Sequence, residues 1–414
     1  MKTVQEPTIA SSFPAPTAFV FSGGGSRGAY QVGVWQGLRE LDQTPGIVTG
    51  TSVGSINAAL VAQDSFDLAF HLWKELETNM VFDLDEIASP RLTQALPAEL
   101  KHSAVEEMAV YAKAFVTQGG VGSKTLERLL HDYIDEEKIR RSPIEYGLVT
   151  ASLPLLKPCY LYKEQISQGK LIPFIIASSS FYPAIQSCEI DGVKYVDGGY
   201  VDNLPVQMAL DRNAASVIAI DLNAIGIVRK SSWTQAPHLH IIQSHWDLGN
   251  LLIFNRDHAE RIMNLGHWDC LKSFGFFDGM LYCFAKGAVS ARLLPAAEAA
   301  GRSFDLDPSI LYTKTEFNRR LLEAVKEKKY ALQKELHTLK QSISNPTQAL
   351  GSFAELLKNT SGVKLVFFLA DILRENPDSQ TLLRHRTIRS LVKTEYLAAH
   401  YLLTEHLLPE EPEK

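Results

Sequence analysis

Long hydrophobic runs are missing from this chain of 414 residues. The longest, residues 171–185 and 363–373, are short or interrupted by polar residues, whereas a membrane-spanning helix needs about 20 apolar residues. Residues 1–16 are polar and contain prolines, without the apolar centre of a signal peptide. We therefore expect a flexible tail over residues 1–16 and a cytoplasmic protein that touches a bilayer, if at all, from its surface.

Cysteine is also scarce, and no pair has the spacing of a metal or redox motif. The four cysteines are scattered at Cys159, Cys188, Cys270 and Cys283, which favours buried thiols over disulfides or a metal site. The formal net charge is only −6, so composition does not suggest nucleic acid as a partner. We expect neither a metal nor a cofactor.

The chain does contain enough apolar residues for a large core, since 45% of its residues are hydrophobic and 21% are charged. Apolar segments of strand type alternate with helical patterns in the first two thirds of the chain. This alternation predicts an α/β fold with a mostly parallel central sheet. The expected strands cover residues 17–22, 47–51, 145–152, 158–163, 216–221 and 238–242.

The most informative stretch is a Gly-x-Ser-x-Gly turn at residues 50–54, which lies between a short apolar strand and a helix. Such a turn pushes the hydroxyl of Ser52 clear of the backbone and places it at a helix N-terminus, where negative charge is favoured. Gly50 and Gly54 allow the close backbone approach that this geometry needs. Ser52 is therefore a candidate nucleophile.

A glycine loop at residues 23–28 precedes this turn by one strand-helix unit. The loop also fits a dinucleotide-binding turn, since the acidic Glu40 and Asp42 follow at nearly the expected distance. That alternative leaves the Ser52 turn without a purpose. An acyl-transfer enzyme uses both loops, because glycine N–H groups can hold an oxyanion and both loops would lie at one edge of the sheet.

A third glycine-rich segment follows a predicted hairpin over residues 188–196 and reads Asp197-Gly198-Gly199. An aspartate at a strand end, after the nucleophile in the chain, is where a catalytic partner is expected. A carboxylate with an ordinary pKa of about 4 is a poor base for a serine hydroxyl, and partial burial makes it a better one. Asp197 is therefore the candidate base.

These three segments together resemble the patatin-like phospholipase family. Its pattern is a Gly-Gly-Gly-x-Arg-Gly loop, a Gly-x-Ser-x-Gly turn and an Asp-Gly-Gly or Asp-Gly-Ala turn, matched in order by residues 23–28, 50–54 and 197–199. Shorter matches lie at residues 182–183, 202–205 and 247–269, the last similar to bacterial members. The resemblance covers roughly residues 17–275 and leaves the C-terminal helices unassigned.

The resemblance implies a three-layer α/β/α fold and a lipid acyl hydrolase of phospholipase A or lysophospholipase type. In it, Ser52 would be the nucleophile and Asp197 the general base, acting through an acyl-enzyme on a phospholipid or lysophospholipid. The implied oxyanion donors are the N–H groups of Gly24, Gly25, Ser26 and Val53. The motif glycines are Gly23, Gly28, Gly50, Gly54, Gly198 and Gly199.

Two other readings of the site stay open. A Ser-His-Asp esterase would need a histidine after the acid, and the chain offers His238, His240, His245, His258 and His267. A protein that keeps the fold but only binds lipid is the other possibility. Arg27 could bind a lipid phosphate or make structural hydrogen bonds, and the structural role is favoured.

We expect a catalytic domain over residues 17–307 and a helical accessory region over residues 308–414. An insertion at about residues 79–123 could act as a lid, and residues 248–271 are predicted to be largely helical. The C-terminal helices could mediate oligomerisation, and their basic residues could contact a membrane surface.

Overall fold

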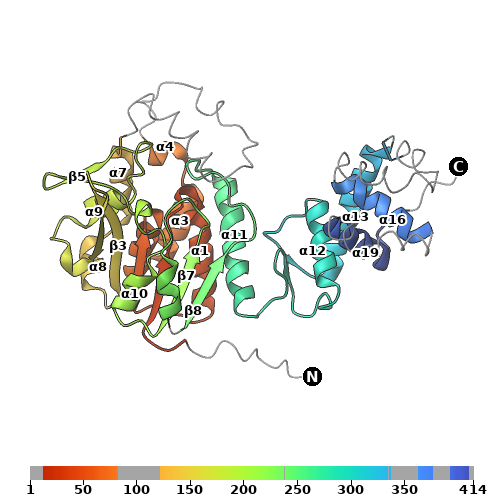
Figure 1. Ribbon diagram of the computed structural model, residues 1–414, viewed down its shortest axis with the longest axis horizontal. Helices are drawn as coiled ribbons and strands as arrows, with labels where there is room; N and C mark the ends of the chain where they lie inside the picture. The colour runs from red at the N-terminus through yellow and green to blue at the C-terminus, as the bar shows by residue number, and fades with distance from the viewer. Residues whose placement is uncertain are drawn as a thin grey trace. The chain divides into compact units, whose positions relative to one another are not determined.

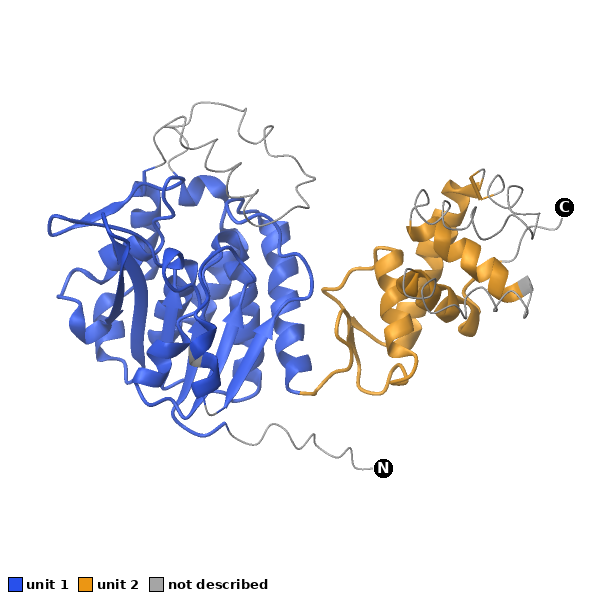
Figure 2. Cartoon of the chain, in the orientation of Figure 1, with its two compact units in different colours: residues 1–274 blue, residues 275–414 orange. Residues whose placement is uncertain are grey.

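The computed structural model describes residues 13–82, 122–236, 238–333, 335–336, 362–375 and 392–409. The chain divides into two units, residues 1–274 and residues 275–414 (Figure 2). Of the predicted tail, residues 1–12 lie outside the described residues, as do residues 83–121 of the predicted insertion. The possible lid therefore stays a prediction.

A sheet of eight strands forms the centre of unit 1, in the order β5-β6-β3-β2-β1-β7-β8 with β4 beside β3 (Figure 1). Five strands pair in parallel: β1 (Thr17–Phe21), β2 (Ile47–Thr51), β3 (Glu145–Ser152), β7 (Ser216–Asp221) and β8 (Leu239–Gln243). The others pair antiparallel with β3 or with each other: β4 (Lys157–Tyr162), β5 (Cys188–Ile190) and β6 (Val193–Asp197). The predicted mostly parallel sheet is confirmed.

Both faces of the sheet are covered, because alternate side chains of a strand point to opposite faces. Ala18 and Val20 of β1 share a hydrophobic cluster with residues of α10 (Val206–Asp211). Phe19 and Phe21 are also fully buried and point to the other face. The helices of that face are α1 (Gly28–Glu40), α2 (Val53–Ala62), α3 (Phe66–Glu75), α9 (Leu171–Ser178) and α11 (Arg256–Ser273). Unit 1 is thus a three-layer α/β/α sandwich.

Unit 2 has an aromatic core of its own. Its strands β9 (Cys283–Phe284) and β10 (Leu311–Tyr312) pair in parallel, and Phe317 packs edge-to-face on Tyr282, Phe284 and Tyr312. The described helices are α12 (Leu294–Ser303), α13 (Lys314–Ala331), α16 (Gly362–Glu375) and α19 (Lys393–Thr404). Because Tyr282 and Phe284 belong to this core, the boundary falls before Gly275, earlier than the predicted residue 308.

One predicted helix is shorter than expected. Helix α11 begins at Arg256, where the Asn255 side chain accepts the N–H of His258 at 3.1 Å and caps the first turn. Residues 248–255, predicted as part of this helix, instead form a loop after β8. This loop contacts the candidate site, as shown below.

Two expectations from composition can be compared with the structure. All four cysteines are free thiols; Cys270 and Cys283 are buried, while Cys159 and Cys188 are half-buried. Among the described residues, no helix combines the length and apolarity that crossing a bilayer requires.

Candidate active site

Ser52 occupies the sharp turn between β2, which ends at Thr51, and α2, which begins at Val53. Its backbone has φ 56° and ψ −131°, a conformation that costs a non-glycine residue roughly 1–3 kcal/mol. The flanking glycines permit the turn, because a Cβ on Gly50 would overlap the carbonyl oxygen of Gly54. Strain of this kind, held in place by the surrounding fold, is typical of functional sites.

The strand pairing explains why Asp197 lies next to Ser52. Strand β4 covers one edge of β3. The other edge of β3 must therefore be shared by β2 and β6. Strand β2 follows that edge as far as Thr51, opposite Val149. Strand β6 runs in the reverse direction and ends with Asp197 opposite the next residue, Thr150. The two strands meet end to end, which brings the serine turn and the aspartate together.

The Asp197 carboxylate is 4% exposed. Burial raises its pKa to about 6, although hydrogen bonds from the Ser52 side chain and the N–H of Gly199 lower it. The N–H of Gly199 lies 2.7 Å from Oδ1 of Asp197. A carboxylate with this pKa is ionised at neutral pH and more basic than an ordinary aspartate. It is therefore suited to accept a proton from the Ser52 hydroxyl.

The glycine loop joins β1 to α1, which begins at Gly28, through a short 3-10 turn over residues 25–27. Gly24, Gly25 and Val53 line the same cavity as Ser52. Within the described chain, no acceptor is seen for the N–H groups of these three residues. They are the available donors for negative charge that develops beside Ser52.

The structure corrects the expected role of Ser26. Its N–H donates to the carbonyl oxygen of Leu251 at 2.8 Å, and its hydroxyl donates to the carbonyl oxygen of Asn250. Both acceptors lie in the loop that sequence analysis assigned to a helix. The Ser26 N–H is therefore committed to the fold, and the candidate oxyanion donors that are left are Gly24, Gly25 and Val53.

Asn203 ties the glycine loop to the aspartate turn. Its carbonyl oxygen accepts the N–H of Gly23 at 3.1 Å, and its N–H donates to the carbonyl oxygen of Ile227 at 2.6 Å. The N–H of Ile227 in turn donates to the carbonyl oxygen of Gly199 at 2.9 Å, in the turn η4 (Gly198–Tyr200) that follows β6. Asn203 thus positions the glycine loop. In the sequence it appeared only as part of the family match at residues 202–205.

Sequence analysis missed Ser178, which supports the Ser52 turn directly. Its Oγ accepts the N–H of Ser52 at 2.9 Å and donates to the carbonyl oxygen of Val149 at 2.6 Å. Ser178 is the last residue of α9 and is fully buried. The small residues 177–180 are the feature of the sequence that could have drawn attention to Ser178. Nothing in this segment indicated that Ser178 would contact Ser52.

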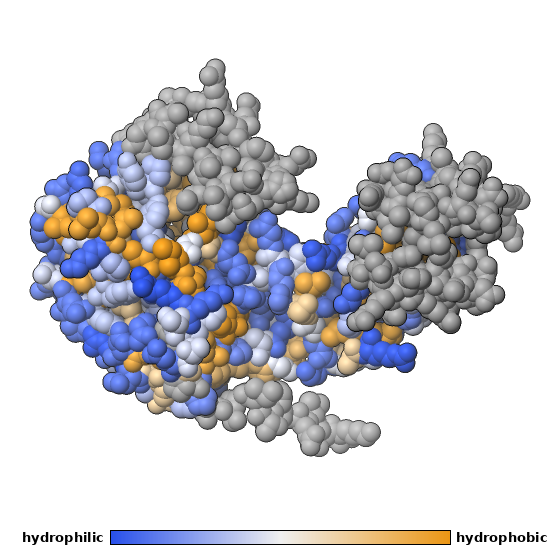
Figure 3. Space-filling view, viewed as in Figure 1, coloured by the Kyte–Doolittle hydropathy of each residue, from blue (hydrophilic) through white to orange (hydrophobic). Residues whose placement is uncertain are grey.

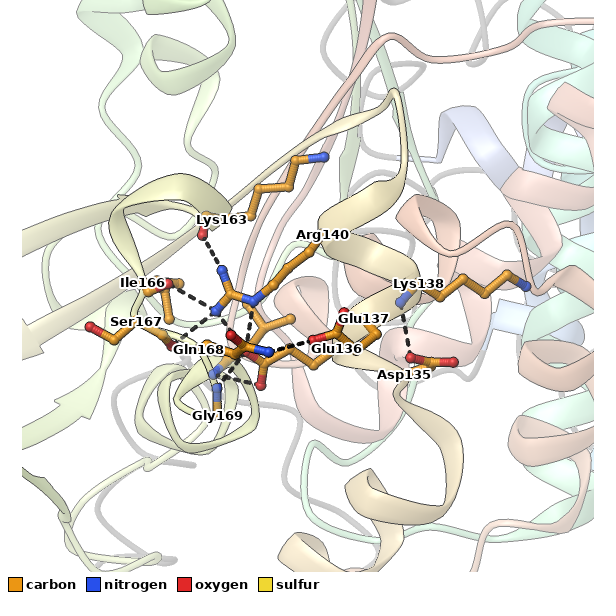
Figure 4. Close-up of polar contacts among 11 residues, drawn as sticks. Asp135, Glu136, Glu137, Lys138, Arg140, Lys163, Ile166, Ser167, Gln168 and Gly169 are labelled. Atoms are coloured by element: carbon orange, nitrogen blue, oxygen red, sulfur yellow. Dashed lines mark hydrogen bonds and ion pairs between the residues drawn. The ribbon is translucent and has the colours of Figure 1, made fainter.

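Figure 4 shows the contacts that hold the segment before α9. Arg140 on α8 (Glu136–Arg141) donates to Oε1 of Glu136 at 2.8 and 2.6 Å. Glu136 accepts the N–H groups of Gly169 at 2.8 Å and Leu171, the first residue of α9, at 3.3 Å. Arg140 also donates to the carbonyl oxygens of Lys163, Ile166 and Ser167. These contacts fix the start of the helix that ends in Ser178.

Ser52 and Asp197 lie in the wall of a cavity of about 350 Å³ in unit 1. The rest of the wall is mainly apolar and comes from α3, α4 (Thr78–Val81), α7 (Lys124–Tyr133) and the loops at the carboxyl edge of the sheet. It includes Leu72, Trp73, Leu76, Phe82, Leu130 and Phe254. An apolar cavity with a few convergent polar groups is typical of a binding site for a small apolar ligand.

Arg27 and three of the five candidate histidines make contacts outside the cavity. Arg27 donates to the carbonyl oxygens of Gly249 at 2.7 Å and Asn223 at 3.3 Å, which supports its structural role. His240 contacts Ser273, His258 contacts the carbonyl of Leu248, and His267 contacts Glu40. No histidine is among the described residues that line the cavity. The described residues also contain no cluster of His, Cys, Asp or Glu placed to hold a metal ion.

The chain matches known proteins over about half of its length. "Patatin-like phospholipase domain-containing protein 6" of Mus musculus is 27% identical over 210 residues, which are 50% of this chain and 13% of the mouse protein. "Lysophospholipase nte1" of Aspergillus terreus is 26% identical over 211 residues, 50% of this chain and 12% of that protein. An NTE family protein of Mycobacterium bovis is 28% identical over 217 residues, 52% of this chain and 51% of that protein.

The matching segment thus spans only about an eighth of the mouse and fungal relatives. Among solved structures, VipD from Legionella pneumophila aligns over 97% of this chain and 93% of its own, with 13% identity and a TM-score of 0.42. The model of the family "Patatin-like phospholipase" matches residues 19–210, which include β1, the serine turn and the aspartate turn. Residues 19–210, a little under half of the chain, therefore match a patatin-like phospholipase domain.

Proposed function

We propose that unit 1 is a lipid acyl hydrolase that cleaves the ester bonds of phospholipids or lysophospholipids with a Ser52–Asp197 dyad. The observation that carries the proposal is the juxtaposition of a strained serine turn and a buried carboxylate in one apolar cavity. The match of residues 19–210 to the patatin-like phospholipase family and the names of the fungal and mammalian relatives support the same chemistry.

In the first step, Oγ of Ser52 attacks the carbonyl carbon of the ester while its proton passes to Asp197. The tetrahedral oxyanion is held by the N–H groups of Gly24, Gly25 and Val53 and by the N-terminus of α2. Asp197 then returns the proton to the leaving alcohol, which departs and leaves an acyl-enzyme on Ser52. Water then attacks the acyl-enzyme while Asp197 takes a proton from it, and Asp197 passes this proton to Oγ of Ser52 as the acyl–oxygen bond breaks and the fatty acid leaves.

The raised pKa of Asp197 explains how a carboxylate can do this without histidine. A base works best when its pKa lies near the operating pH, and burial has moved this group from its usual 3.8 to about 6. The apolar walls would accept an acyl chain and exclude water, which strengthens hydrogen bonds to the oxyanion.

The Ser-His-Asp alternative has less support, because the described cavity wall contains no histidine. The lipid-binding alternative leaves the strained backbone of Ser52 unexplained.

Hydrolysis of short-chain p-nitrophenyl esters and of phosphatidylcholine by wild type, Ser52→Ala and Asp197→Asn tests the proposal. We expect wild-type turnover and its loss in both variants. Labelling with a fluorophosphonate, located by mass spectrometry, should modify Ser52 in wild type. Turnover by Ser52→Ala equal to wild type on every ester would defeat the enzyme assignment. Full activity of Asp197→Asn would refute the dyad and revive the search for a histidine.

A further inference from the structure

Exposed large hydrophobic side chains in unit 1 gather at one edge of the sheet. Among its described residues, Leu68 on α3 lies near the opposite edge. The others lie on connections at the carboxyl edge, where Ser52 is found: Leu155, Leu156, Tyr182, Val193, Ile227 and Ile253. Single exposed hydrophobic residues are normal, but a concentration around a site indicates a contact surface.

Two hairpin ends form the most exposed part of this group. Leu155 and Leu156, in the turn between β3 and β4, are 86% and 42% exposed, and Val193, at the start of β6, is 39% exposed. The two hairpins lie side by side, because the N–H of Leu153 donates to the carbonyl oxygen of Lys194 at 2.8 Å. We call Leu155, Leu156 and Val193 the hairpin tip.

The hairpin tip projects beyond the nucleophile. Thr51 pairs with Val149, and β3 continues past this level to Ser152 before its turn. At about 3.3 Å per residue, the tip lies roughly 10 Å or more beyond Ser52 along the strand direction. Closer to the site, Ile227 lines the cavity and is 55% exposed, and Tyr182 is 54% exposed. Exposed apolar residues therefore extend from the cavity wall to the tip.

The charges around the tip are mixed. Lys157 and Lys194 are exposed beside it, Glu189 lies opposite Lys194 in the strand register, and Lys170 is paired with Asp191 at 2.6 Å. In the view of Figure 3, hydrophobic residues also gather on the side of unit 1 where α9 and β5 lie. Lysines beside exposed leucines and an amphipathic tyrosine suit the boundary between headgroups and acyl chains, where Lys reaches phosphate.

We propose that the hairpin tip docks unit 1 on the surface of a phospholipid bilayer, with Leu155, Leu156 and Val193 inserted among the acyl chains. This proposal rests on the proposed function, because a lipid hydrolase must draw its substrate from an aggregate. Docking at this edge places the cavity next to the bilayer, so that an ester can reach Ser52 along an apolar path. Because the local charges are nearly balanced, apolar insertion drives binding and salt has little effect.

The test uses the full chain in the Ser52→Ala background, which prevents lipid turnover during binding. Co-sedimentation with vesicles of phosphatidylcholine containing a minor fraction of phosphatidylglycerol measures partition. We expect Leu155→Ser to weaken partition roughly tenfold, and Leu155→Ser with Val193→Ser to weaken it further. Leu68→Ser is the matched control, because the exposure of Leu68, 38%, is close to the 39% of Val193, but Leu68 lies away from the carboxyl edge. It should leave partition unchanged.

The same substitutions in the active chain separate docking from chemistry. The hairpin variants should hydrolyse a soluble p-nitrophenyl ester at the parental rate and vesicle lipid at a rate reduced about as much as partition. Parental partition of the hairpin variants, or no partition of the parent, overturns the proposal. A third result would also overturn it. If sedimentation velocity shows that these substitutions convert a dimer to a monomer while partition stays the same, the tip joins two copies of the chain. Tip-dependent partition without any ester turnover by wild type would support docking and reject the hydrolase.

Discussion

Asp197 and Asp202 are two buried aspartates only five positions apart, yet their surroundings give them different roles. Asp197 is 4% exposed and Asp202 is 1% exposed, and burial raises the pKa of each to about 6. Their surroundings differ. Asp197 faces Ser52 and lines the cavity, whereas Asp202 accepts a hydrogen bond from the Tyr160 hydroxyl at 3.3 Å and lies near Arg229.

A raised pKa therefore does not by itself identify a catalytic base. Both carboxylates have the basicity that the reaction needs, but only Asp197 is within reach of a nucleophile and of the cavity. Asp202 serves the same region through its backbone, because its carbonyl oxygen accepts the Thr51 hydroxyl at 2.8 Å. Position decides the role, and substitution to asparagine should separate the two residues.

The largest effect is expected for Asp197→Asn. Asparagine keeps the shape and can still accept the N–H of Gly199, but it cannot take a proton from Ser52. We expect kcat to fall by about 10³–10⁴-fold, measured with a soluble ester. Since the buried charge is removed, thermal unfolding at pH 7 should occur at an equal or higher temperature. Loss of activity together with collapse of stability would instead mark Asp197 as a structural residue.

Sequence reasoning found the parts of this site that are local. The turn at Ser52 is specified by five consecutive residues, and the two glycines after Asp197 marked it as the candidate base. The supporting contacts depend on pieces of chain far apart. Ser178 reaches Ser52 because of where α9 ends, and the Ser26 N–H is taken by Leu251 in a loop that looked helical. Hydrophobic periodicity shows which residues are buried but not which distant carbonyl an N–H will meet.

The predicted boundary near residue 308 differs from the division of the structure after residue 274 for a related reason. The change from mixed elements to long helices near residue 308 is visible in the sequence, but cores are formed by contacts. Tyr282 and Phe284 pack with Tyr312 and Phe317 across about thirty intervening residues. Composition cannot show that pairing.

The next largest effect concerns Ser52, the other half of the proposed dyad, since a base can act only on a correctly held serine. Ser178→Ala removes the acceptor of the Ser52 N–H and leaves a buried donor unpaired, which costs about 1–3 kcal/mol. We expect kcat to fall about 10–100-fold with KM changed little, because an interaction that orients the nucleophile is lost. Ser178→Thr keeps the hydroxyl and should recover part of the rate. Equal losses in both variants would attribute the effect to packing.

Activity and stability should depend on pH in opposite ways. Protonation of Asp197 removes the base, so kcat/KM should fall about tenfold per pH unit below about pH 6. Stability should move the opposite way. Both aspartates have folded-state pKa values above the ordinary 3.8, so the folded chain binds more protons than the unfolded chain between about pH 4 and pH 6.

Each group therefore adds stability that is complete below about pH 4 and is lost as pH rises through about 6, by at most roughly 3 kcal/mol per group. Urea unfolding between about pH 4 and pH 7 measures this change in stability. Asp197→Asn and Asp202→Asn are the controls, because each removes the contribution of one aspartate. A kcat/KM that stays flat down to pH 5 would remove Asp197 from the role of base, whatever its effect on stability.

The smallest effect on activity is expected for Asp202→Asn. The amide oxygen can still accept the Tyr160 hydroxyl, and the backbone contact to Thr51 is untouched, so kcat should stay within about threefold of wild type. Stability at pH 7 should be equal or higher, because the raised pKa shows that burial disfavours the charged form even beside Arg229. The decisive measurement is the acid limb of the activity profile: it should keep its midpoint in Asp202→Asn, since that limb belongs to Asp197. A midpoint that moves by a full pH unit would mean that the two carboxylates titrate together, and the separation of roles between them would have to be abandoned.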